Sequence, residues 1–169
     1  MESVEQKKTS SMTIFRWVMM FPAGLLGVGL FWILIQYPLT RFVMPELVGY
    51  GWEDSWVYLL THVLCEIGMV YSYYFIGARV APGKKKGLEI LSLILLFYFF
   101  RNLIRTATFF LDETLMVAVT YALMTLVQLL YAGFVLYHVS NTDESKLNRV
   151  AKFFRLSLPK EEQALGIVN

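Results

Sequence analysis

The chain has 169 residues, of which 57% are hydrophobic, 16% aromatic and 17% charged, and its mean hydropathy is +0.54. Soluble globular domains are about 45–50% apolar and about 25% charged, so this composition excludes an ordinary soluble domain and predicts an all-α integral membrane protein. A net charge of +2 excludes the strongly basic balance of a nucleic-acid-binding protein, and the single cysteine, Cys65, excludes an internal disulfide and a thiolate metal centre. We therefore predict no cofactor and no metal.

Four apolar stretches approach the roughly 20 residues that a helix needs to cross a bilayer. They cover about residues 17–37, 56–78, 88–111 and 114–138. We expect an antiparallel bundle of four transmembrane helices within residues 14–139, a polar N-terminal segment over residues 1–13 and a tail over residues 140–169. The first stretch is longer than the core of a signal peptide, and no small-residue cleavage pattern follows it, so we interpret it as a retained anchor.

The connection after the first span, TRFVMPELVGYGWEDS, is predicted to be the longest loop of the membrane domain. Its aromatic residues, together with those that begin the second span, fit an interfacial belt. A lid over a ligand is the alternative interpretation of this loop. The aromatic residues in question are Tyr50, Trp52, Trp56 and Tyr58.

The second span contains THVLCEIG, residues 61–68, which places His62 and Glu66 at membrane depth and on one helix face, four residues apart. The third span carries RNLIR, in which Arg101 and Arg105 have the same spacing. Counted from the outer ends of the two spans, Glu66 is level with Arg101, and His62 is level with Arg105. Ionisable groups at this depth usually face the bundle interior and pair with one another. We therefore expect Glu66 to face Arg101.

Amides and hydroxyls extend this predicted buried polar cluster. Thr61, Asn102 and Thr106 are candidate hydrogen-bonding partners, and Gln128, near the middle of the fourth span, either lines the cluster or forms a single interhelical hydrogen bond. The cluster has two interpretations: a structural one, in which it fixes the helix register, and a functional one, in which it handles protons, binds a substrate or supplies a catalytic acid. The predicted members are His62, Glu66, Arg101, Asn102, Arg105 and Gln128.

The tail contains DESKLNRVAKFFRLSL, which we predict to be a basic amphipathic helix over about residues 143–158. Its apolar residues fall on one face and its basic residues on the other, a pattern typical of helices on anionic membrane surfaces. Docking against a cytoplasmic partner protein is the alternative. The predicted contact residues are Lys146, Arg149, Lys152, Phe154 and Arg155.

Lysine and arginine are distributed unevenly about the predicted spans. Twelve lie in the N-terminal segment, in RVAPGKKKG and in the tail, whereas Arg41 stands alone on the other side. Since positive residues in short loops stay in the cytoplasm, we expect both termini there, in a plasma membrane or a bacterial inner membrane. The KKK run, residues 84–86, is read as a topology signal, with a lipid-binding or nucleic-acid-binding patch as the alternative.

Two functions remain open from the sequence, and whether the protein is an enzyme is undecided. No P-loop, nucleophile elbow or metal-binding helix motif is present, so no catalytic residues are predicted. The first function is that of a small membrane protein acting through helix and tail contacts: an accessory subunit, an assembly factor or an immunity-type protein. Its expected partners are the lipid bilayer and a homo-oligomer or larger membrane complex. The alternative is a small-ligand membrane enzyme or transporter that uses the polar cluster.

Overall fold

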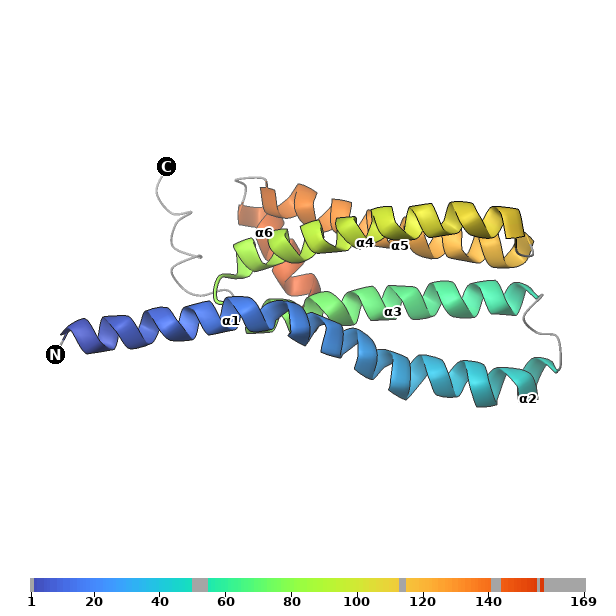
Figure 1. The fold of residues 1–169 in the computed structure, drawn as a ribbon, viewed down its shortest axis with the longest axis horizontal. Helices are drawn as coiled ribbons and strands as arrows, with labels where there is room; N and C mark the ends of the chain where they lie inside the picture. The colour runs from blue at the N-terminus through green and yellow to red at the C-terminus, as the bar shows by residue number, and fades with distance from the viewer. Residues whose placement is uncertain (1, 50–54, 113–114, 141–143, 155, 157–169) are drawn as a thin grey trace.

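A computed structural model of the protein describes residues 2–49, 55–112, 115–140, 144–154 and 156, and this part of the chain contains helices and no strands. Consecutive long helices run in opposite directions (Figure 1). The elements are α1 (Glu2–Phe31), η1 (Trp32–Gln36), η2 (Leu39–Val43), α2 (Met44–Val48), α3 (Trp56–Val80), α4 (Lys84–Asp112), α5 (Leu115–Ser140) and α6 (Glu144–Phe153).

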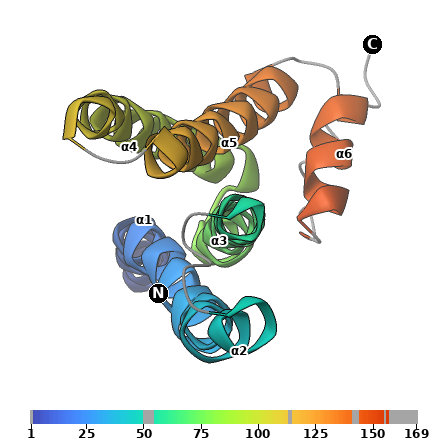
Figure 2. The same ribbon diagram turned by 90° about the vertical axis from the view of Figure 1, so that its right-hand side faces the viewer.

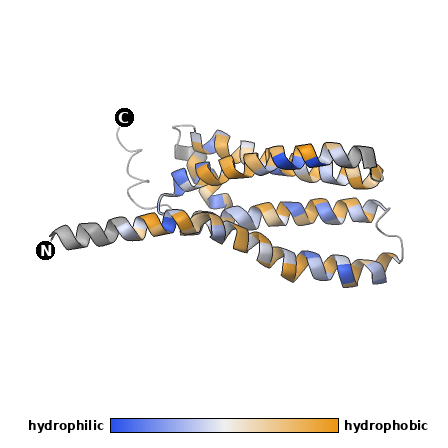
Figure 3. Ribbon diagram, in the orientation of Figure 1, coloured by the Kyte–Doolittle hydropathy of each residue, from blue (hydrophilic) through white to orange (hydrophobic). Residues whose placement is uncertain are grey.

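Four helical stretches are long and apolar enough to cross a membrane, which confirms the prediction of an all-helical chain with four candidate spans. They cover Ser11–Val48, Trp56–Val80, Lys84–Thr108 and Leu115–Ser140. Large apolar side chains also remain exposed along them, among them Leu34, Leu64 and Phe97. Hydrophobic residues, drawn in orange, recur along the long helices (Figure 3). Soluble monomers rarely expose apolar patches of this extent, so the surface indicates a membrane protein.

The first span is longer than predicted, because the chain stays helical through Val48 instead of entering a loop near residue 40. Pro38 lies between two π-helical segments, η1 and η2. A proline inside a helix removes a backbone hydrogen bond and clashes with the preceding turn, and a wider π turn relieves that crowding. The Thr40 hydroxyl donates to the carbonyl oxygen of Gln36 at 2.9 Å. Gly49, with φ of 93°, ends α2, and residues 50–54, including Tyr50 and Trp52, lie outside the described residues.

Glycines allow α1 to pack closely against α3. A Cβ atom added at Gly27 would lie 2.6 Å from the backbone oxygen of Ser72, and one at Gly68 would overlap the ring of Phe31. Small residues at such crossings let helix backbones approach in the membrane, where dispersion and hydrogen bonding hold helices together. α1 and α3 therefore form one close pair, and α4 and α5 lie side by side as a second pair (Figure 2).

The two pairs meet at α3, which contacts α5 and also contacts α4 near the connection between α3 and α4. There the Tyr74 hydroxyl lies 2.8 Å from that of Ser92, and the Tyr73 hydroxyl donates to the Leu91 carbonyl at 3.3 Å. Tyr74 is fully buried. These bonds satisfy the polar ends of large aromatic side chains inside the core.

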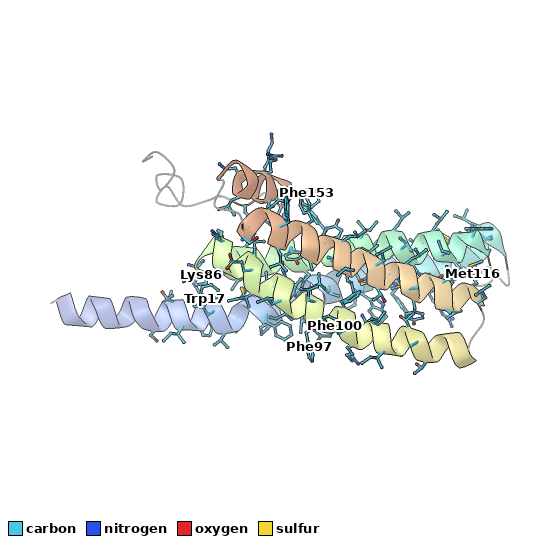
Figure 4. The ribbon with its side chains drawn as sticks, turned by 90° about the horizontal axis from the view of Figure 1, so that it is seen from above. Trp17, Lys86, Phe97, Phe100, Met116 and Phe153 are labelled. Atoms are coloured by element: carbon cyan, nitrogen blue, oxygen red, sulfur yellow. The ribbon has the colours of Figure 1, made fainter. Side chains whose placement is uncertain are left out.

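We call the end of the bundle that holds the α3–α4 connection and α6 the basic end. Lys86, Trp17 and Phe153 lie toward this end, and Met116 lies at the other (Figure 4). Lys84 Nζ donates to the carbonyls of Ala78, Arg79 and Ala81 at 3.0–3.2 Å. Arg16 Nε donates to the Val80 carbonyl at 3.0 Å. Cations therefore cap the last carbonyls of α3, where the helix dipole is negative.

The short helix α6 lies against α3 and α5 at the basic end and buries its apolar face on the bundle. Phe154, which follows α6, is fully buried, with ring centroids 5.1 Å from Tyr74 and 5.5 Å from Tyr71. This corrects the prediction that Phe154 contacts the membrane or a partner. The physical reason is that the tyrosines of α3 offer an aromatic surface within the chain.

The basic residues of α6 that the structure describes, Arg149 and Lys152, are exposed. The side chains of Lys146 and Arg155 lie outside the described part, as do residues 157 and 158 of the predicted helix. The described helix is thus Glu144–Phe153, shorter than the predicted 143–158. Its basic face points away from the bundle core.

Candidate functional site

Three polar side chains from three helices form a hydrogen-bonded relay inside the bundle. Gln128 Nε2, on α5, donates to Glu66 Oε1, on α3, at 2.7 Å. Asn102 Nδ2, on α4, donates to Gln128 Oε1 at 3.1 Å. Glu66 is only 5% exposed. The predicted cluster members Glu66, Asn102 and Gln128 are therefore brought together, with Gln128 bonded to both of the others.

Arg101 and Arg105, also predicted for the cluster, are exposed, so the structure does not place them in the buried relay. The predicted pairing of Glu66 with Arg101 is replaced by the bond to Gln128. The arginines face outward because successive residues of a helix differ by about 100° in direction around its axis. Asn102 and Thr106 face inward as an i, i+4 pair, and each arginine precedes one of them by a single residue.

His62 is half-buried and is held within its own helix. Its Nδ1 lies 3.0 Å from the Tyr58 carbonyl, and its ring centroid is 4.1 Å from that of Tyr58. His62 lies four residues from Glu66, as the sequence predicts, but the bonds of the relay run from Glu66 toward α5 and α4. The histidine is thus packed beside the tyrosine, one turn away from the relay.

The nearby threonine hydroxyls bond mainly to their own helices. Thr106 Oγ1 donates to the Asn102 carbonyl at 2.8 Å, and Thr125 Oγ1 donates to the Tyr121 carbonyl at 2.7 Å. The two hydroxyls also lie 3.4 Å apart across the α4–α5 contact. Such local bonds satisfy the donor without a partner helix. Thr61, a further predicted candidate, is buried, and its hydroxyl lies 3.8 Å from the sulfur of Met44.

A cavity of about 190 Å³ adjoins the relay. Glu66 and Gln128 line it, and its other walls are aliphatic, thioether and tyrosine side chains from α1, α3 and α4. The lining residues are Leu25, Val28, Glu66, Met69, Val70, Tyr73, Leu95, Tyr98 and Gln128. Sequence reasoning missed the apolar members of this set, because an apolar residue facing a cavity is indistinguishable in sequence from one facing lipid. Tyr98 was the one sequence signal for this cavity wall, because it is a polar aromatic residue within an apolar stretch.

Glu66 has one hydrogen-bonding or ion-pairing partner among the described residues, Gln128. That bond is made at Oε1, and Glu66 also lines the cavity. A carboxylate in an apolar interior is costly to bury unless it is hydrogen-bonded and its charge is compensated. The relay satisfies Oε1, and Glu66 stands in the wall of the cavity that a bound molecule would occupy.

Within the described residues, no three His, Cys, Asp or Glu side chains are grouped as metal ligands would be. No family model, characterised protein or solved structure matches the chain.

Proposed function

We propose that this protein binds a small, largely apolar molecule inside the membrane, in the cavity between α1, α3, α4 and α5. The observation that carries the proposal is the composition of the cavity wall, in which one carboxylate and one amide stand among apolar and aromatic side chains. Ligand sites are mostly apolar with a few convergent polar groups that fix the orientation of the ligand. Glu66 and Gln128 would hold the polar end of the molecule, and the apolar walls would hold its body.

The size of the cavity limits the ligand. An engineered apolar cavity of about 150 Å³ binds benzene, whereas sites for drug-sized molecules measure about 300–1,000 Å³. A cavity of about 190 Å³ therefore suits a compact molecule, such as a singly substituted aromatic ring. We propose a membrane location with both termini in the cytoplasm, so the ligand would enter from the lipid phase or along the helix contacts.

The experiment measures binding of benzyl alcohol to the full-length protein in nanodiscs, by ligand-observed NMR. The variant Val28→Phe should fill the cavity and abolish saturable binding, because Val28 lines it. The matched control is Val18→Phe on the same helix, at a side chain that is 64% exposed and outside the cavity, which should bind as the wild type does. Binding that survives Val28→Phe, or the absence of saturable binding by both benzyl alcohol and its amine counterpart, benzylamine, would overturn the proposal.

A second candidate function is contact with other membrane components through the tail. It is supported by α6, which buries Phe154 and leaves Arg149 and Lys152 exposed at the basic end. Cationic side chains near an anionic lipid surface gain about 1 kcal/mol each. A spin label at Asn148, which is exposed on α6, should lose accessibility to an aqueous relaxation agent when the nanodisc contains anionic lipid. High salt should restore it, and equal accessibility in neutral and anionic nanodiscs would exclude this contact.

A further inference from the structure

We infer that the cavity selects a cation: an ammonium group on a compact apolar body, with Glu66 as its counter-ion. This inference rests on the proposed function and specifies the chemical class of the ligand. Glu66 Oε1 accepts from Gln128, and Glu66 lines the cavity. A bound molecule would place its polar end beside this carboxyl group, so the charge of that end decides the affinity.

Burial in an apolar interior disfavours the ionised form of a carboxyl group, and the relay offsets part of that cost. Gln128 donates to Glu66, and Asn102 donates to the side-chain oxygen of Gln128 and so supports that donor. Hydrogen-bond donors directed at a carboxyl group stabilise its charged form. Amides supply no net charge, however, and the carboxylate has no ion-pair partner among the described residues. A bound cation would supply the charge that this site lacks.

Four other positive groups of the bundle do not fill that role. Arg101 and Arg105 lie on the exposed side of α4, and neither lines the cavity. Lys84 and Arg16 bond to the carbonyls that end α3, at the basic end of the bundle. Among the described residues that line the cavity, Glu66 is thus the one acidic group, and most of the others are apolar.

The aromatic walls favour the same ligand class. Tyr73 and Tyr98 line the cavity with Glu66, and the Tyr73 hydroxyl is occupied by its bond to the Leu91 carbonyl. Aromatic rings attract cations through their quadrupole, most strongly where water is excluded. A neutral alcohol would gain one hydrogen bond to Glu66 but leave its charge uncompensated. An anionic ligand would be repelled by the same carboxylate.

The test compares three isosteric probes: benzylamine, benzyl alcohol and benzoate. Binding to the full-length protein in zwitterionic nanodiscs at neutral pH is measured by ligand-observed NMR, so that lipid charge does not concentrate any probe. Benzylamine should bind at least tenfold more tightly than benzyl alcohol, and benzoate should show no saturable binding. The variant Glu66→Gln should bring the amine and the alcohol to within about threefold of each other, whereas the control Arg101→Gln should preserve the wild-type ranking.

The outcomes separate the inference from the proposed function. If benzyl alcohol binds as tightly as benzylamine, cation selection is overturned while small-molecule binding stands. If none of the probes binds, both fall. Even if Glu66→Gln does not fold, the order of the three probe affinities in the wild-type protein tests cation selection. Glu66→Asp is then the second variant. That change keeps the charge but withdraws it by one methylene, so it should retain a preference for the amine.

Discussion

Glu66 Oε1 accepts a 2.7 Å hydrogen bond from Gln128 Nε2, which joins α3 to α5 across 62 positions of sequence. Hydrogen bonds to charged groups contribute about 1.5–3 kcal/mol. Gln128→Leu should therefore lower the free energy of unfolding by about that amount, because it leaves the carboxylate without its donor. The double variant with Glu66→Leu should recover part of the loss. Thermal unfolding in detergent, arranged as a double-mutant cycle, measures the coupling.

Arg101 provides the contrast for this cycle, because it lies on the exposed side of α4. Arg101→Gln combined with Glu66→Leu should be additive within about 0.5 kcal/mol. A coupling as large as that of Gln128 would show that the two charges interact after all, and would restore the pair predicted from sequence.

Replacement of Gly27 by alanine should destabilise the contact between α1 and α3. The new Cβ would lie 2.6 Å from the backbone oxygen of Ser72, so one helix would have to move. Overpacking of this kind typically costs about 1–3 kcal/mol. Gly29→Ala is the matched control, since a Cβ there meets nothing within 4 Å. We expect a lower melting temperature for Gly27→Ala alone, and equal melting temperatures would contradict the close crossing.

Phe154 should hold α6 on the bundle. The side chain is fully buried, whereas its neighbour Phe153 is 46% exposed. Truncation of a buried phenylalanine typically costs about 3–5 kcal/mol, more than a short docked helix can lose and remain bound. Phe154→Ala should therefore speed tryptic cleavage after Arg149 and Lys152, and Phe153→Ala should change it much less. Similar cleavage rates for the two variants would mean that α6 docks through other residues.

Lys84 should stabilise the end of α3. Its ammonium group donates to three carbonyls, those of Ala78, Arg79 and Ala81. Lys84→Gln should lower the free energy of unfolding by about 1 kcal/mol, the usual contribution of such bonds and of a cation at a helix C-terminus. Lys86→Gln, at an exposed position of the same run, is the control and should have little effect. A chemical-denaturation curve in mild detergent distinguishes the two.

The proposed topology has both termini in the cytoplasm. The start of α1, the α3–α4 connection and α6 lie toward the same end of the bundle (Figure 1), which agrees with a common side for their basic residues. Reporter fusions after Ser140 and within residues 82–86 should give cytoplasmic signals, and a fusion near Glu46 should give the opposite signal. An external reporter after Ser140 would exclude this orientation.

The helical class and the candidate spans were predictable from sequence. A span needs about 20 apolar residues whatever its neighbours are, so composition along the chain is enough to place α3, α4 and α5. The outer end of α1 was not predictable in the same way. Pro38 and the polar residues after it indicate a loop, and only the π-helical segments and the Thr40 bond show that the helix continues.

The membership of the polar site was predictable only in part. Sequence alone identified Glu66, Asn102 and Gln128 as polar groups in apolar spans, because such residues are costly there and usually inward-facing. The partner predicted for Glu66, Arg101, was wrong. Counting residues along a span gives the depth of each side chain in the membrane, but it does not give the rotation of α4 or show which helix lies next to α3. Tertiary packing set α5 beside α3, turned Arg101 outward and gathered apolar residues from α1 and α4 around the carboxylate, and so it alone decided the cavity.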